Sequence, residues 1–127
     1  MLVIALPLTR ATRGMLGARE LALMKPTAIL VNVSRAAVID ERALYEHLRD
    51  HPGFGAGIDT WWHEPGPDSG FSTEYPFFDL PNVIGSPHNS GTVDGALEVG
   101  ARKAAENVRR FLHGEAVTGV IRRDDYL

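Results

Sequence analysis

NVIGSPH, residues Asn82–His88, reads as a short apolar strand that ends abruptly and is followed at once by a histidine. Pro87 has no N–H to give to a sheet and favours an extended conformation at Ser86, so the strand must stop there. His88 is therefore predicted on a loop at the C-terminal end of a strand. Open parallel sheets bind their ligands at that edge, and this makes His88 the first candidate for chemistry.

Three earlier segments also have the apolar or β-branched character of parallel strands: Leu2–Leu6, Thr27–Val33 and Phe54–Ile58. The run Leu2–Leu6 is continuous, as in a strand covered on both faces. The segment from Gly66 to Leu80 shows no periodicity and is predicted to be an ordered surface loop.

Helical segments alternate with these strands. Ala18–Met24 carries strong helix formers, and Asp40 is an N-cap for a helix whose inward face holds Ala43, Leu44, Tyr45 and Leu48. The longest helix is expected to begin at a cap on Thr92 or Asp94 and to end at Gly114. The alternation predicts an α/β fold, a partial Rossmann-like parallel sheet of about four strands with flanking helices and a long C-terminal helix.

The composition narrows the class of protein. The 127 residues are 44% hydrophobic and 23% charged, which is typical of a globular domain. A net charge of −3 gives no reason to expect nucleic acid or a membrane as partner, and we expect a cytoplasmic protein. There is no cysteine, so thiolate chemistry is excluded.

Four polar residues follow the predicted strand ends: Arg35, Asp59, Glu64 and His88. A guanidinium can hold a substrate carboxylate by two parallel hydrogen bonds. A carboxylate beside an imidazole makes a proton donor and acceptor suited to interconverting an alcohol and a ketone. Each residue also has a plainer interpretation, as a surface arginine, a cap aspartate, a loop glutamate or a structural histidine.

Two apparent motifs do not hold. The glycines of Gly53–Gly57 resemble a dinucleotide loop but precede a strand instead of following one. His63 and Glu64 do not continue into a zinc-binding helix because Pro65 follows them, so no metal site is predicted. Trp61 and Trp62 could wall an apolar pocket or lie in an interface.

In combination, these segments resemble the D-isomer-specific 2-hydroxyacid dehydrogenases. The likeness is carried in order by Leu6–Thr9, Thr12–Gly14, Met24–Pro26, Val31–Arg35, Val38–Leu44, Gly57–Asp59, Glu64–Pro65 and Leu80–His88. The sequence departs from the family pattern at Ala36, where glycine is usual, at Trp61-Trp62-His63, and at Asn89-Ser90.

The resemblance implies a role for each site residue. Arg35 would bind the substrate, Glu64 would tune the histidine, and His88 would be the acid/base while hydride passes between a nicotinamide and the substrate C2. The implied residues for NAD or NADP are Pro7 and Thr9 at the adenosine side, Val33 and Ser34 at the nicotinamide end, Asp59 at the carboxamide, and Ser90.

The family's glycine fingerprint, ribose-binding acid and substrate domain would precede Leu2 and are not in the sequence. Residues 1–127 are therefore expected to be the C-terminal part of an NAD(P)-binding Rossmann domain, including the helix returning toward the absent substrate domain. Because pyrophosphate binds at a helix N-terminus of the other half, we expect weak or no NAD(P) binding and an inactive isolated fragment.

The expected partners are a small 2-hydroxy or 2-oxo acid, and either the missing N-terminal half or a second copy in a homodimer. The alternative is a non-catalytic truncated homologue, a dimerisation module that pairs through an edge strand and the apolar face of its long helix. Whether the chain is itself an enzyme stays open at this point.

Overall fold

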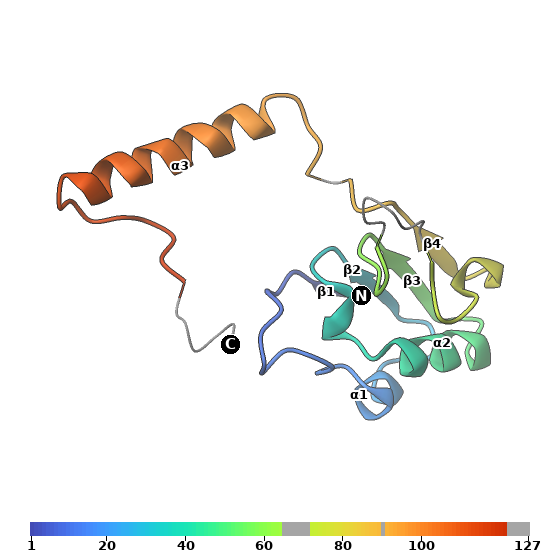
Figure 1. Cartoon of the computed structure of the whole chain (residues 1–127). Coiled ribbons are helices and arrows are strands. Elements are labelled where there is room, and N and C mark those ends of the chain that lie inside the picture. The colour runs from blue at the N-terminus through green and yellow to red at the C-terminus, as the bar shows by residue number, and fades with distance from the viewer. Residues whose placement is uncertain (65–71, 90, 122–127) are drawn as a thin grey trace. The chain divides into compact units, whose positions relative to one another are not determined.

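The computed structural model describes residues 1–64, 72–89 and 91–121. The chain divides into two compact units, Met1–His88 and Asn89–Leu127. The first unit contains the alternating strands and helices expected from the sequence, and the second contains the long helix (Figure 1).

The sheet of the first unit has four parallel strands in the order β1-β2-β3-β4. They are β1 (Leu2–Ile4), β2 (Ile29–Asn32), β3 (Gly55–Ile58) and β4 (Val83–Gly85). Each lies within a predicted strand and is shorter than it. Because every strand pairs with the next one along the chain, right-handed connections return on the same side of the sheet.

Two helices cover that side: α1 (Ala18–Ala22) and α2 (Glu41–Asp50). The predicted cap of α2 is confirmed, since Asp40 Oδ1 accepts the backbone N–H of Ala43 at 2.8 Å. Short 3₁₀ turns, η1 (Ala36–Val38) and η2 (Phe77–Asp79), complete the unit. Neither turn was predicted. The loop expected at Gly66–Leu80 lies in part outside the described residues, at 66–71.

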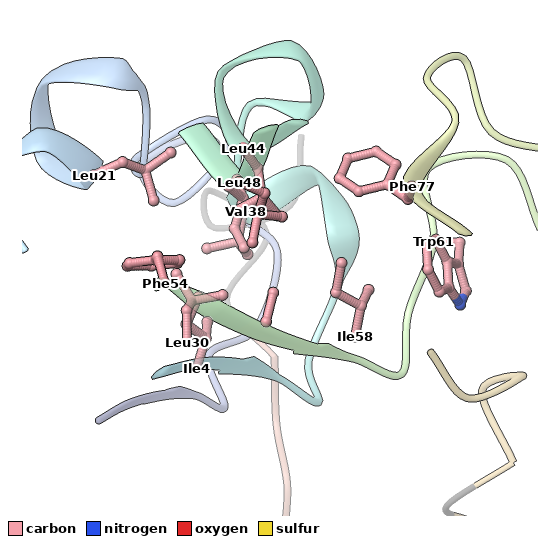
Figure 2. Close-up of a cluster of buried hydrophobic side chains, with 12 residues drawn as sticks. Ile4, Leu21, Leu30, Val38, Leu44, Leu48, Phe54, Ile58, Trp61 and Phe77 are labelled. Carbon is pink, nitrogen blue, oxygen red and sulfur yellow. The ribbon is translucent and has the colours of Figure 1, made fainter. Parts of the chain in front are cut away.

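The core lies between the sheet and these helices. Figure 2 shows Leu21 of α1 and Leu44 and Leu48 of α2 facing Leu30 and Ile58 of the sheet, and all five are almost fully buried. The predicted inward face of α2 is thus correct.

The opposite face of the sheet is apolar and exposed. The strand register places Val3, Val31, Gly57 and Ile84 in one row across it. Val3 is 52% and Ile84 79% exposed. The expectation that Leu2–Leu6 is covered on both faces is therefore wrong for the described residues, because all the connections return on one side.

The second unit is built on α3 (Ala96–Leu112). The predicted caps at Thr92 and Asp94 are wrong: the helix begins after Gly95, whose φ of +78° breaks the helical geometry that either cap would need. The predicted end is correct, since Gly114 follows the helix in the left-handed conformation with φ +70°. No residue of α3 is buried. None of the helices in the described ranges combines the length and hydropathy that crossing a bilayer requires.

Candidate functional site at the carboxyl edge of the sheet

The segments after the four strands carry every candidate site residue in the first unit. Pro7 and Thr9 follow β1, Arg35 follows β2, and the remaining candidates follow β3 and β4. Parallel strands bring these segments to one edge of the sheet, so residues far apart in the sequence become neighbours.

Glu64 and His88 are in direct contact. His88 Nδ1 lies 2.8 Å from Glu64 Oε1 and 2.9 Å from Oε2; the His88 side chain is 35% exposed and that of Glu64 is 36% exposed. A carboxylate can only accept hydrogen bonds, so this contact places a ring proton on Nδ1. Nε2 is then the ring nitrogen available to bond a reacting group. His88 also has a φ of +53°, a left-handed conformation uncommon in residues other than glycine.

The charge of Glu64 is held in place by its neighbours. Partial burial raises the pKa of Glu64, but hydrogen bonds from His88 and from the Trp61 backbone N–H, with the charges of His88 and Arg35, outweigh it. The net pKa of Glu64 therefore lies below its usual 4.5. The Glu64 carboxylate is therefore ionised at neutral pH.

Arg35 belongs to the same edge and acts on Glu64 through its electric field. It is exposed, and its Nη1 donates to the backbone oxygen of Ser34 at 2.7 Å. Within the described ranges Arg35 forms no ion pair shorter than 4 Å, so its guanidinium is not neutralised by a bound carboxylate there. An exposed cation beside an acid/base pair is the arrangement that a carboxylate-bearing ligand requires.

The loop carrying Arg35 is shaped by Asn32, a residue that the sequence interpretation did not assign. Asn32 is fully buried; its Oδ1 accepts the N–H and the hydroxyl of Ser34, and its Nδ2 donates to the backbone oxygen of Arg35. A polar residue at an inward position of an apolar strand was the signal available for it.

The predicted cofactor residues follow different strands. Pro7 and Thr9 lie in one turn, where the Pro7 oxygen and the Thr9 N–H both bond the Thr12 hydroxyl at 2.8 Å. Val33 is 46% exposed and Ser34 is 7% exposed at the exit of β2. Ser90 lies outside the described residues.

Asp59 is buried at the exit of β3, and the Ser86 hydroxyl donates to its Oδ1 at 2.6 Å. Ser86 was also missed, because the direction of a hydroxyl cannot be read from the sequence. A carboxylate accepts hydrogen bonds, as the N–H groups of a carboxamide require, so Asp59 fits a nicotinamide. No group of three or more histidine and carboxylate side chains in the described ranges is placed to hold a metal ion.

Comparison with known proteins gives the family. Residues 1–90 match the family described as D-isomer specific 2-hydroxyacid dehydrogenase, NAD binding domain. The chain belongs to this family, as its fold and its sequence motifs led us to expect.

Two curated relatives and one solved structure illustrate the similarity. The chain is 41% identical over 122 residues to a glyoxylate reductase of Thermococcus gammatolerans, covering 96% of the chain and 35% of that protein. It is 37% identical over 115 residues to a D-3-phosphoglycerate dehydrogenase of Methanocaldococcus jannaschii, covering 91% and 21%. A D-isomer specific 2-hydroxyacid dehydrogenase of Xanthobacter autotrophicus Py2, solved with NADPH and MES, superposes with a TM-score of 0.78 at 33% identity, covering 94% of this chain and 47% of that one. The chain thus spans less than half of each of these relatives.

Proposed function

We propose that residues 1–127 form the catalytic part of the NAD(P)-binding domain of a 2-hydroxyacid dehydrogenase. The observation that carries this proposal is the contact of 2.8 Å between Glu64 and His88 at the carboxyl edge of the sheet. Membership of the family and the position of Arg35 at the same edge support it.

The residues divide the chemistry as follows. Arg35 binds the carboxylate of a 2-oxo or 2-hydroxy acid by paired hydrogen bonds. His88 donates a proton from Nε2 to the carbonyl oxygen in reduction and removes it from the hydroxyl in oxidation, while Glu64 stabilises the imidazolium. A bound NAD(P) supplies or accepts the hydride at C2, and Asp59, Val33 and Ser34 would hold its nicotinamide end.

The proposal predicts that the 127 residues alone bind the cofactor weakly or not at all. The dinucleotide glycine fingerprint is not among them, and the Gly53–Gly57 run forms part of β3. Without a helix N-terminus to hold the pyrophosphate, the adenosine and nicotinamide contacts are not sufficient. A fluorescence titration of the chain with NADH tests this; micromolar affinity would contradict it.

Activity is tested in a chimera. Residues 1–127 replace the matching segment of the glyoxylate reductase of Thermococcus gammatolerans, to which they are 41% identical. The chimera should reduce glyoxylate with NADH or NADPH, and His88→Ala should slow hydride transfer by roughly 10²- to 10⁴-fold. His47→Ala, on the far end of α2, is the matched control and should leave the rate unchanged. An undiminished rate in the His88→Ala chimera would remove the assignment.

A second candidate function is self-association through α3. Leu97, Ala101, Ala104, Val108 and Phe111 recur at alternating spacings of four and three, the pattern of a helix that packs lengthwise on another. Leu97 is 90% and Phe111 75% exposed. We propose a second copy of the chain as the partner of this stripe, which is compatible with a catalytic role.

A further inference from the structure

Trp61 bonds both of the segments that carry the acid/base pair. It follows β3, is 4% exposed, and uses both of its N–H groups. Its backbone N–H donates to Glu64 Oε1 at 3.1 Å, and its indole Nε1–H donates to the backbone oxygen of Ser86 at 2.8 Å. One residue therefore contacts the carboxylate and also the segment that ends in His88.

Gly85 leaves the space that the Trp61 indole occupies. A Cβ at Gly85 would lie 2.6 Å from Trp61 Cζ2 and 3.0 Å from Phe78 Cε1, so any larger residue there would displace the indole. The absence of a side chain at residue 85 lets the indole lie directly against the backbone of β4.

Packing and a directional bond together fix the indole. Its ring lies against Phe77 and Phe78, with centroid separations of 6.1 and 4.9 Å, and a cavity of about 220 Å³ lined by Trp61, Phe78, Gly85, Ser86 and Pro87 lies beside it. The hydrogen bond to the Ser86 oxygen is the contact that ties the ring to the segment leading to His88. Such a bond is stronger in these largely apolar surroundings than it would be in water.

We propose that Trp61 is a positioning residue, which holds the His88 loop against Glu64 by bonding the Ser86 backbone while its own backbone bonds the carboxylate. This inference rests on the proposed function, because it gives Trp61 its role through the pair that performs the proton transfer. His88 adopts a left-handed backbone conformation two residues after the bonded carbonyl, and an anchored Ser86 limits its return to an ordinary one.

The test compares two neighbouring tryptophans, each of which donates its indole N–H to a backbone oxygen of another segment. Trp61→Phe removes the N–H that bonds the Ser86 oxygen. Trp62→Phe removes an equivalent N–H, which donates to the Ile39 oxygen at 3.0 Å, and Trp62 also stacks on Phe77. Both variants lose one partly buried hydrogen bond and some ring area, so a purely structural role predicts similar behaviour in the two.

The readout is the titration of the Glu64 carboxyl carbon, followed by NMR in the full 127-residue chain. The groups that act on Glu64 are His88, Arg35 and the Trp61 backbone N–H. We expect the pKa of Glu64 to rise toward 4.5 in Trp61→Phe, because His88 moves away, and to stay at its wild-type value in Trp62→Phe. An unchanged Glu64 titration in folded Trp61→Phe, or an equal rise in both variants, would overturn the proposal.

Gly85→Ala provides a second route if Trp61→Phe does not fold. The added Cβ displaces the indole without removing its N–H, and the pKa of Glu64 should rise here as well; a wild-type titration would count against positioning.

His88→Ala separates this inference from the proposed function. A rise of the pKa of Glu64 in His88→Ala but not in the Trp61 and Gly85 variants keeps the pair and refutes the role of Trp61. If His88→Ala itself leaves the titration unchanged, the pair is not formed and the proposed acid/base assignment fails.

Discussion

At the scale of single residues, the site depends on contacts that link one strand exit to the next. The sequence predicted Arg35, Glu64 and His88 as candidates because each follows a strand, and the structure places Glu64 and His88 within hydrogen-bonding distance. Asn32, Trp61 and Ser86 could not be assigned in the same way. Their partners are backbone atoms or hydroxyls whose direction is decided only when the strands are side by side.

The ion pairs of Glu106 in α3 give a prediction for how stability depends on pH. It accepts hydrogen bonds from Arg109 and Arg110, and these bonds lower its pKa to about 2. Since the folded pKa lies below the usual 4.5, the stabilisation is fully present above pH 4.5 and is lost as the pH falls toward 2.

We therefore expect the helical circular dichroism of α3 to weaken in that pH window, and to weaken less in Glu106→Gln, which has no charge to lose. NMR titration of the Glu106 carboxyl carbon measures the pKa directly. A midpoint near 4.5 would show that the two arginines do not hold the carboxylate.

At the scale of elements, the fold was largely predictable from sequence periodicity. All four strands and three α-helices were found where the apolar patterns placed them, with ends shortened by a few residues. The start of α3 was missed because the left-handed Gly95 overrides two good capping residues. The turn η2 was missed because its aromatic residues have no helical period; they are held by contacts such as that of Phe77 with Trp62.

Asn82 joins two of these elements. Its Nδ2 donates to the backbone oxygens of Leu48, at the end of α2, and Phe54, before β3, at 3.0 and 2.7 Å. Asn82→Ala leaves these carbonyls without that donor, and we expect it to lower the free energy of unfolding by about 1–3 kcal/mol, measured by urea denaturation.

The matched control is Asn107→Ala. Asn107 also bonds a backbone carbonyl, that of Thr118, but on the exposed surface of the second unit, where water can replace it. Asn107→Ala should lower the free energy of unfolding by about 0.5 kcal/mol at most, as is usual for surface substitutions. An equal decrease in the free energy of unfolding in the two variants would show that the Asn82 hydrogen bonds do not stabilise the packing of α2 against β3.

At the scale of the whole molecule, each unit has an apolar surface that its own described residues do not cover: one face of the sheet in the first unit and the stripe along α3 in the second. The apolar face of the long helix was expected from the sequence, whereas the open face of the sheet was not, because the exposure of a strand depends on which elements lie over it. Apolar patches of this kind mark places where proteins associate.

Self-association is therefore expected in solution. Sedimentation equilibrium should show a dimer, and Val108→Lys, on the α3 stripe, should convert it to a monomer by placing a charge in the interface. Val99→Lys is the control, because residue 99 lies on the opposite side of the repeat. A monomeric wild-type chain would argue against the second candidate function.

The strand order β1-β2-β3-β4 has a consequence for how the protein is made. Each strand hydrogen-bonds to the one synthesised just before it, and none has to wait for a distant segment before it can pair. These four strands can therefore be added one after another during translation, each joining an edge already in place. His88 follows β4 and can meet Glu64 only after β4 has joined the sheet, so the contact between the two forms once all four strands are paired.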